Sequence, residues 1–535
     1  METNNTTQKH SLLSPAVAQI RDFWRDVGSR RSYWMPLLLL AILGFGYSTF
    51  NQTLSIDDLA RGYYLMDDMA MVASTRWGMT LWMLLFSSVE FSPFIDKLLG
   101  VAFWMAGATL GAALLYAVNG RRKCLWPYAA FSCLVLTYPL VNEIWEYSGA
   151  NMVIPGNLVL TCLALHLLVS QPRRTLGATV VAGVLMTFVT ASYESGTFVY
   201  ITMVFMLLYL KYSSAAAPAG RWQWLREGAS YVPALAISVV LRFAVGYGLI
   251  ALLGLQHMRV GATTINWLTK GVTKSLRYLR YNLRDYGILR AAYLPIAVFD
   301  AAAAFFTAHF VVRCVRKRSL RPLLIGLLLL ASLFSLAFIQ GCTMPYRTAQ
   351  TIQIFVGFAG YLLVDALPHG DPRPRARRFA ALVTALCLFL SFRQAICLHR
   401  ILALNHQRSE NEISIIHDIG DRLYGGYDLS KPVVFTGNVR LGSWIEDQVS
   451  APVRGKTQRL VSTNVNSMLN WGKRAFYGQR EMKHYFALCG YDIQVIETFD
   501  GTHSYDGYLA AATSAGMAPM EIRDMGDYIM VYFGD

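Results

Sequence analysis

Long apolar segments, separated by short polar ones, recur along roughly the first three quarters of this 535-residue chain. Many are roughly 17 to 22 residues long, about the length of helix that crosses the hydrocarbon core of a bilayer. The pattern predicts a polytopic α-helical membrane protein with about eleven transmembrane helices. We expect these helices at about residues 33–53, 97–118, 124–141, 152–170, 175–191, 196–210, 229–253, 291–312, 322–340, 351–367 and 379–398.

The pattern becomes that of a soluble domain after about residue 400. We expect an amphipathic helix at 413–423, short strands at 432–436, 493–496 and 528–533, and helices at 476–488 and 508–512. Strands that alternate with helices predict a small α/β domain with a partly parallel sheet. The expected parts are an N-terminal arm (1–32), a transmembrane domain (33–400) with outer loops at 54–96 and 254–290, and a C-terminal domain (401–535).

Composition and charge agree with this interpretation. The chain is 54% hydrophobic and only 15% charged, and its mean hydropathy is +0.36, which excludes an ordinary soluble protein. Its net charge of +15 is concentrated in short loops between the predicted helices. Such loops usually stay in the cytoplasm, so the charge indicates membrane topology, and we expect no nucleic-acid partner.

The basic loops also orient the chain. Arg30 and Arg31 precede the first predicted helix and place the N-terminus inside. The basic loops then alternate regularly, so the C-terminal domain is expected outside. Residues 256–290 are an exception, because this segment is outer and basic.

The most acidic stretch follows the first predicted helix. Asp57 and Asp58 lie near its start, and the spacing of apolar residues predicts a helix from Leu59 to Met71 along the membrane surface. Carboxylates held near a bilayer are costly and therefore suggest function. The alternative is a solvated loop in which Asp57 or Asp58 caps a helix.

Several other charges are expected on the outer face. Glu143 and Glu146 could form either a site or a solvated helix face, and Glu194 could belong to a site or cap the helix at 196–210. Arg347 follows Met-Pro-Tyr in an outer loop, where it suits a phosphate contact better than an incidental surface charge.

A basic stripe is predicted in the outer segment 256–290. Lys270, Lys274 and Arg277 are three or four residues apart, so a helix would present them on one face. They could bind the phosphate of a lipid substrate, or outer-leaflet phospholipid without specificity.

Metal chemistry has little support in the sequence. The outer histidines are scattered, without the spacing of a helical metal site, and no metal ligands are assigned. The outer carboxylates could hold a divalent cation such as Mg²⁺ or Mn²⁺, but their spacing does not demand one. Hydrolase and metalloprotease motifs are also missing from the sequence.

One stretch carries a resemblance to known proteins. Residues 55–64, Ser-Ile-Asp-Asp-Leu-Ala-Arg-Gly-Tyr-Tyr, are followed by Arg76-Trp77-Gly78 ahead of the second predicted helix. This arrangement resembles the GT-C superfamily of integral-membrane glycosyltransferases. It resembles more narrowly the glucosyltransferase type II family associated with O-antigen modification. The resemblance covers roughly residues 33–400. The second part of the motif, Arg76-Trp77-Gly78, is the looser match because of its residue order.

The resemblance implies an activity. The enzyme would transfer a hexose, expected to be glucose, from a polyprenyl-phosphate donor to a cell-envelope glycan, on the outer face of a bacterial cytoplasmic membrane. Asp57 or Asp58 would act as general base, and a single displacement would invert the anomeric centre. The expected substrate-binding residues are Arg61, Arg76, Glu143, Glu146, Glu194, Lys270, Lys274, Arg277 and Arg347.

Two alternatives come from other functional classes. A transporter or flippase for lipid-linked sugars would suit eleven helices, with Arg242 and Asp300 as candidate charges along its path. However, the sequence shows no pair of Gly/Pro-broken helices in two corresponding halves. A nonenzymatic envelope scaffold would leave the acidic stretch unexplained.

Overall fold

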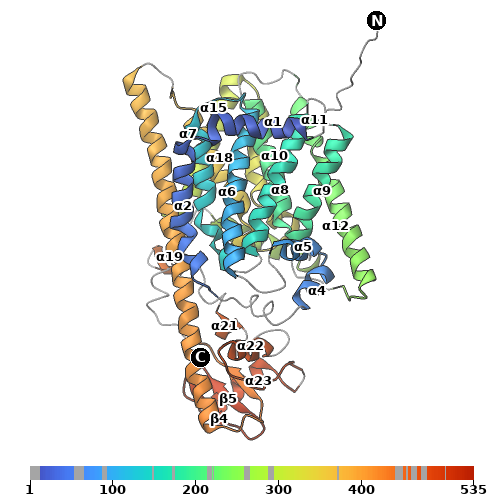
Figure 1. Cartoon of the computed structure of the whole chain (residues 1–535), viewed down its shortest axis with the longest axis vertical. Coiled ribbons are helices and arrows are strands. Elements are labelled where there is room, and N and C mark those ends of the chain that lie inside the picture. The colour runs from blue at the N-terminus through green and yellow to red at the C-terminus, as the bar shows by residue number, and fades with distance from the viewer. Residues whose placement is uncertain are drawn as a thin grey trace.

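A computed structural model shows a helical bundle joined to a small α/β domain (Figure 1). The residues it describes are 13–53, 66–86, 93–146, 150–171, 175–213, 220, 222–257, 265–286, 294–369, 373–439, 450–453, 456–459, 467–471, 479–500 and 502–534.

Each of the eleven ranges predicted to cross the membrane contains helix. The bundle helices are α2 (Arg31–Phe50), α6 (Pro93–Val118), α7 (Leu125–Thr137), α8 (Ala150–Ser170), α9 (Leu176–Ser192), α10 (Ser195–Ser213), α12 (Val232–Leu252), α15 (Leu294–Lys317), α16 (Arg321–Ser332), α17 (Ser335–Gln340), α18 (Gln350–Asp365) and α19 (Pro374–Gly426). Among the described residues, seven helical stretches are long and apolar enough to cross a membrane. Helices α7, α9, α16 and α18 are shorter, so the count of eleven crossings stays a prediction.

The interior of the bundle is built from helices that are buried almost all round. Glycines on α18 let it approach α7 closely: a Cβ on Gly357 would lie 2.5 Å from the Val135 side chain, and one on Gly360 would overlap the Leu134 side chain. The peripheral helices instead expose large apolar side chains, such as Leu39 on α2. Exposed apolar side chains on peripheral helices are what a surrounding bilayer would cover.

Short helices cover both ends of the bundle. Helix α1 (Ser14–Phe23), the π-helical turn η1 (Trp24–Gly28) and α11 (Gln223–Ala229) lie at one end. The 3₁₀ helices η2 (Pro139–Glu146) and η4 (Tyr346–Thr348) come from chain connections at the other end. The connection between α12 and α15 contains α13 (Asn266–Thr269) and α14 (Val272–Tyr286). Helix α14 carries Lys274 and Arg277 of the predicted basic stripe, but Lys270 follows α13 and is separated from α14 by Gly271, whose φ is +79°, so the single helix expected for all three is wrong.

The acidic stretch is described only in part. The predicted helix over 59–71 corresponds to α4 (Met66–Ala73), and residues 59–65 lie outside the described part of the chain. A second short helix, α5 (Trp77–Phe86), follows at once within what was expected to be a loop. Helices α4 and α5 lie at the end of the bundle nearer the C-terminal domain (Figure 1).

Helix α19 connects the bundle to the C-terminal domain. It is 53 residues long, roughly 80 Å at the α-helical rise, and it includes both the last predicted crossing and the predicted helix at 413–423. The boundary expected at residue 400 therefore falls inside a continuous helix. Figure 1 shows the domain at the far end of the bundle from α1.

A three-stranded sheet forms the centre of the C-terminal domain. Strands β1 (Val433–Thr436), β5 (Ile529–Tyr532) and β4 (Glu521–Asp524) have the order β1-β5-β4. β1 and β5 are parallel, whereas β4 and β5 are antiparallel, so the partly parallel sheet is confirmed. The strand predicted at 493–496 is wrong, because this segment forms only a bridge between Val495 and Val433.

Helices cover both faces of that sheet. α19 and α22 (Arg480–Leu488) pack on one face, and α23 (Tyr505–Ser514) packs on the other. The remaining described elements are the unpredicted antiparallel pair β2 (Ser450–Val453) and β3 (Lys456–Arg459), and α21 (Met468–Trp471). The domain thus has its own small core.

Candidate functional site

Charged side chains from distant parts of the chain meet near the turn between α9 and α10. Arg76 comes from the connection between α4 and α5, and Glu194 lies in the turn itself. Arg242 is contributed by α12, Glu143 by η2 and Arg347 by η4. We call these five side chains, together with Tyr193, the arginine–glutamate cluster.

Glu194 is held between two arginines. Arg76 donates from Nε to Oε1 at 3.2 Å and from Nη2 to Oε2 at 3.0 Å. Arg242 Nη2 donates to Oε1 at 2.8 Å. The side chains of Arg76, Glu194 and Arg242 are 13%, 19% and 8% exposed, respectively. Because they are largely buried, their interactions are screened only weakly by the solvent.

The arginines control the ionisation of Glu194. Burial alone would raise the pKa of this carboxyl group, but attraction and hydrogen bonds from Arg76 and Arg242 outweigh burial. Together they lower its pKa from the usual 4.5 to about 2. Glu194 is therefore ionised at neutral pH and is a weak proton acceptor.

Tyr193 joins this group to a second ion pair. Its ring lies 5.5 Å from the Arg76 guanidinium carbon, and its hydroxyl accepts a 2.9 Å hydrogen bond from Arg347 Nε. Glu143 in turn accepts from Arg347 twice, from the side-chain Nη1 and from the backbone N–H at 2.9 Å. The three guanidinium groups and two carboxylates leave a net formal charge of +1.

Close helix packing positions Arg76. A Cβ on Gly78 would lie 2.9 Å from the Phe188 carbonyl oxygen and 2.9 Å from the Ala191 backbone carbon, so glycine lets α5 approach α9. Thr75 has a φ of +62°, a left-handed conformation that turns the chain sharply between α4 and α5. The Trp77 indole N–H donates to the Arg242 carbonyl oxygen at 3.1 Å, which ties this connection to α12.

The basic stripe of α13 and α14 is separate from the cluster. Lys270, Lys274 and Arg277 are exposed, and within the described part of the chain no ion pair joins them to Glu143 or Glu194.

Helix α14 is nevertheless connected to the loop that leads to Arg347. The Asn282 amide donates to the Cys342 carbonyl oxygen at 2.8 Å, and its oxygen accepts from the Met344 N–H at 2.9 Å. Asn282 therefore fixes the backbone at Met344, three residues before Arg347 of η4. Helix α14 is thus hydrogen-bonded to the loop that leads to Arg347 of the cluster.

The structure joins Arg76, Glu143, Glu194 and Arg347 of the predicted binding residues. Asp57, Asp58 and Arg61 lie outside the described part of the chain, and the side chain of Glu146 is also not described. Arg242 was interpreted from sequence only as a charge inside a membrane helix, and its pairing with Glu194 depends on tertiary contacts. Among the described residues, no group of three or more His, Cys, Asp or Glu side chains is arranged to hold a metal ion.

The cluster is suited to holding an anion rather than accepting a proton. Both carboxylates accept hydrogen bonds from arginines, so their oxygens are already occupied. Arginine guanidinium groups present forked donors that match phosphate oxygens. A net positive group of this kind could balance a phosphate.

A family model described as "Glucosyl transferase GtrII" matches residues 46–364, more than half of the chain. The match includes every member of the arginine–glutamate cluster and the Asp57-Asp58 pair. No curated protein sequence matches the chain.

The structure was also compared with solved structures. The apo form of the oligosaccharyltransferase from Archaeoglobus fulgidus is 12% identical, with a TM-score of 0.39 over 82% of this chain and 63% of that one. The form tethered to an acceptor peptide containing the NVT sequon is 14% identical, with a TM-score of 0.36 and the same coverages. This chain therefore spans less than two thirds of the length of that oligosaccharyltransferase.

Proposed function

Because the chain belongs to the GtrII family of glucosyl transferases, and is therefore a membrane glycosyltransferase, we propose that it uses a lipid-linked sugar. The proposed donor is a hexose, taken to be glucose, on a polyprenyl phosphate. The proposed acceptor is a hydroxyl of a cell-envelope glycan on the outer face of a bacterial cytoplasmic membrane. The bundle would have a GT-C architecture.

The base in this proposal is Asp57 or Asp58. It takes the proton of the acceptor hydroxyl while the acceptor oxygen attacks the anomeric carbon of the donor. The bond from that carbon to the phosphate oxygen breaks, and its electron pair leaves with the polyprenyl phosphate. One displacement of this kind inverts the anomeric centre. The transition state resembles an oxocarbenium ion, as in glycoside hydrolysis.

The observation that carries this proposal is the state of Glu194. Its carboxylate is occupied by Arg76 and Arg242, and its pKa is lowered to about 2. It can therefore hold two cations in place but is poorly suited to be the base. We assign that role to the Asp57-Asp58 pair, which lies in the motif that carries the family resemblance.

The cations have a complementary role. We propose that Arg76, Arg242 and Arg347 stabilise the negative charge that develops on the leaving phosphate. The exposed stripe of Lys270, Lys274 and Arg277 would attract the donor head group earlier, at the membrane surface. A phosphate leaving group needs no protonating acid. A divalent cation such as Mg²⁺ or Mn²⁺ is not required by this scheme and stays an open expectation.

The experiment that tests the proposal uses full-length protein in liposomes with radiolabelled polyprenyl-phosphate glucose and an envelope glycan. The expected result is labelled glycan with released polyprenyl phosphate, and an anomeric configuration opposite to that of the donor. Transfer with retention would contradict the single displacement. Movement of the donor between leaflets without any transfer would instead identify a flippase.

A further inference from the structure

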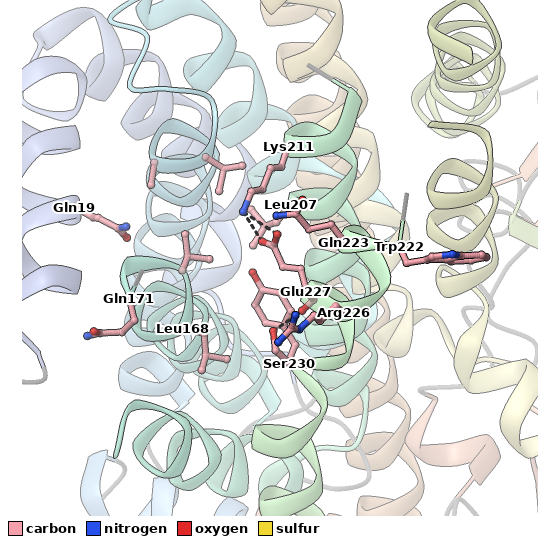
Figure 2. A pocket seen from close by; sticks show the side chains of 14 residues that line it. Gln19, Leu168, Gln171, Leu207, Lys211, Trp222, Gln223, Arg226, Glu227 and Ser230 are labelled. Carbon is pink, nitrogen blue, oxygen red and sulfur yellow. Dashed lines mark hydrogen bonds and ion pairs between the residues drawn. The ribbon is translucent and has the colours of Figure 1, made fainter. Parts of the chain in front are cut away.

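A cavity of about 1180 Å³, drawn in close-up in Figure 2, opens at the end of the bundle that carries α1 and α11 (Figure 1). It is distant from the arginine–glutamate cluster. Glu194 directly precedes α10, whereas Lys211, which lines the cavity, lies in the last turn of the same helix. At the helical rise these residues are roughly 25 Å apart. The cavity is therefore not part of the proposed transfer site.

The cavity has one apolar wall and one polar side. The apolar wall comes from α6, α8 and α10 and consists of Ala117, Val118, Leu168, Val169 and Leu207. The polar side includes Gln223 and Ser230, and Gln19 of α1 lies across the cavity from them (Figure 2). A ligand that fits both sides has an apolar part and a polar part.

The charged groups on the polar side leave one positive charge. Lys211 Nζ donates to both carboxylate oxygens of Glu227 at 2.8 Å, and the Tyr212 hydroxyl donates to Glu227 Oε2 at 2.7 Å. Arg226 also lines the cavity, and among the described residues none forms an ion pair or hydrogen bond with its guanidinium group. The net formal charge of Lys211, Arg226 and Glu227 is thus +1.

Exposed apolar side chains lie beside the polar side. Trp222, which also lines the cavity, is 62% exposed, Leu225 on α11 is 43% exposed, and Val232 at the start of α12 is 58% exposed. Tryptophan is enriched where a membrane meets water. In a chain that has several membrane-length helices, exposed side chains of this kind suit a rim at the level of lipid head groups.

We propose that this cavity binds one phospholipid with an anionic head group, from the leaflet on the side of α1. The phosphate lies against the Arg226 guanidinium group, and Gln223 provides a neutral polar neighbour. An acyl chain lies along the apolar wall formed by α6, α8 and α10. A free phosphate would satisfy Arg226 but would leave that wall uncovered, so the lipid is the occupant that uses the whole cavity.

Native mass spectrometry of the full-length protein in detergent tests this proposal, with added phosphatidylglycerol, phosphatidylethanolamine or inorganic phosphate. One phosphatidylglycerol should be retained in preference to phosphatidylethanolamine. Arg226→Gln should lower that preference roughly five- to tenfold, as expected for one cation near a lipid phosphate. Arg226→Lys should keep most of it. Arg316→Gln, which removes an exposed cation from α15 and not from the cavity, is the matched control.

Glu227→Gln provides a test in the opposite direction. It raises the net charge of the three side chains from +1 to +2, so the preference for phosphatidylglycerol should increase. A lower preference for phosphatidylglycerol in both Glu227→Gln and Arg226→Gln would indicate damage to the fold and overturn recognition by charge. An unchanged preference in Arg226→Gln, or retention of an adventitious additive only, would also overturn the proposal. Equal competition by inorganic phosphate would replace the lipid with a free anion.

Discussion

Arg76 binds both carboxylate oxygens of Glu194, a residue 118 positions away in the sequence, with N···O distances of 3.2 and 3.0 Å. This pair joins the connection after the acidic stretch to the turn between α9 and α10. Arg242 adds a third bond at 2.8 Å. The pair is therefore the centre of the arginine–glutamate cluster.

Glu194→Gln should destabilise the protein strongly. The substitution leaves two largely buried guanidinium groups without their counter-charge, which costs about 3–5 kcal/mol. Thermal unfolding of the purified protein in detergent measures this loss. Glu410→Gln, an equivalent change at an exposed position on α19, should change stability by less than about 0.5 kcal/mol. Similar unfolding temperatures for the two variants would contradict the role given to Glu194.

The same ion pairs predict how stability depends on pH. The pKa of Glu194 is about 2 in the folded protein against a usual 4.5. Because the folded value is the lower one, the stabilisation from this group is fully present above about pH 4.5 and is lost as the pH falls toward 2. The stability difference between wild type and Glu194→Gln should therefore shrink across this window. A difference that stays constant from pH 6 to pH 2.5 would exclude the depressed pKa.

Tyr193→Phe separates the two contacts of this side chain. The ring over Arg76 is retained, whereas the hydrogen bond from Arg347 Nε is lost. We expect a loss of about 1 kcal/mol in stability and lower turnover, because Arg347 loses one of its orienting partners. Steady-state kinetics with the polyprenyl-phosphate donor measure turnover. Tyr247→Phe, on the exposed surface of α12, is the control and should match wild type.

Gly78→Ala should displace α5 from α9. The added methyl group would meet backbone atoms of Phe188 and Ala191 at 2.9 Å, and backbone cannot move aside as a flexible side chain can. Overpacking of this kind costs about 1–3 kcal/mol, and it should also reduce activity by shifting Arg76. Gly248→Ala on α12 has no atom within 4 Å of the new Cβ and should be neutral or slightly stabilising. Equal effects of both substitutions would show that the close approach of α5 has no role.

The basic stripe on α14 should affect donor capture rather than folding. Lys274→Gln combined with Arg277→Gln removes two exposed cations, each worth about 1 kcal/mol near an anionic lipid surface. The KM for the donor should rise at low salt, with less effect at high salt, while the unfolding temperature stays unchanged. Arg375→Gln combined with Arg377→Gln, an equal charge change at the start of α19, should leave the KM unchanged. A rise in KM with both pairs would indicate a general surface-charge effect.

Hydropathy predicted most of the helices because an apolar run of sufficient length has few other structures in a bilayer. It missed α5, whose ten residues are too short for a crossing and were interpreted as loop. It also placed a boundary near residue 400, although α19 continues as helix through the more polar residues that follow. The segment 493–496 has the composition of a strand, yet only Val495 reaches β1.

The sequence predicted most residues of the candidate site, but it did not predict which of their side chains form ion pairs with one another. Position relative to the predicted helices placed Arg76, Glu143, Glu194 and Arg347 on one face of the membrane. Which of them meet depends on how α9, α10 and the connecting segments pack, and periodicity carries no such information. Arg242 is the clearest case, since a charge in the middle of an apolar run gives no sign of its partner.

The central claim is that Asp57 or Asp58 is the base and Glu194 is not. Single-turnover transfer from radiolabelled polyprenyl-phosphate glucose by Asp57→Asn, Asp58→Asn and the neighbouring Asp67→Asn tests it most directly. We expect a fall of roughly 10²- to 10⁴-fold in one of the first two variants, with Asp67→Asn close to wild type and all three proteins folded. Transfer at the wild-type rate by both Asp57→Asn and Asp58→Asn would contradict it.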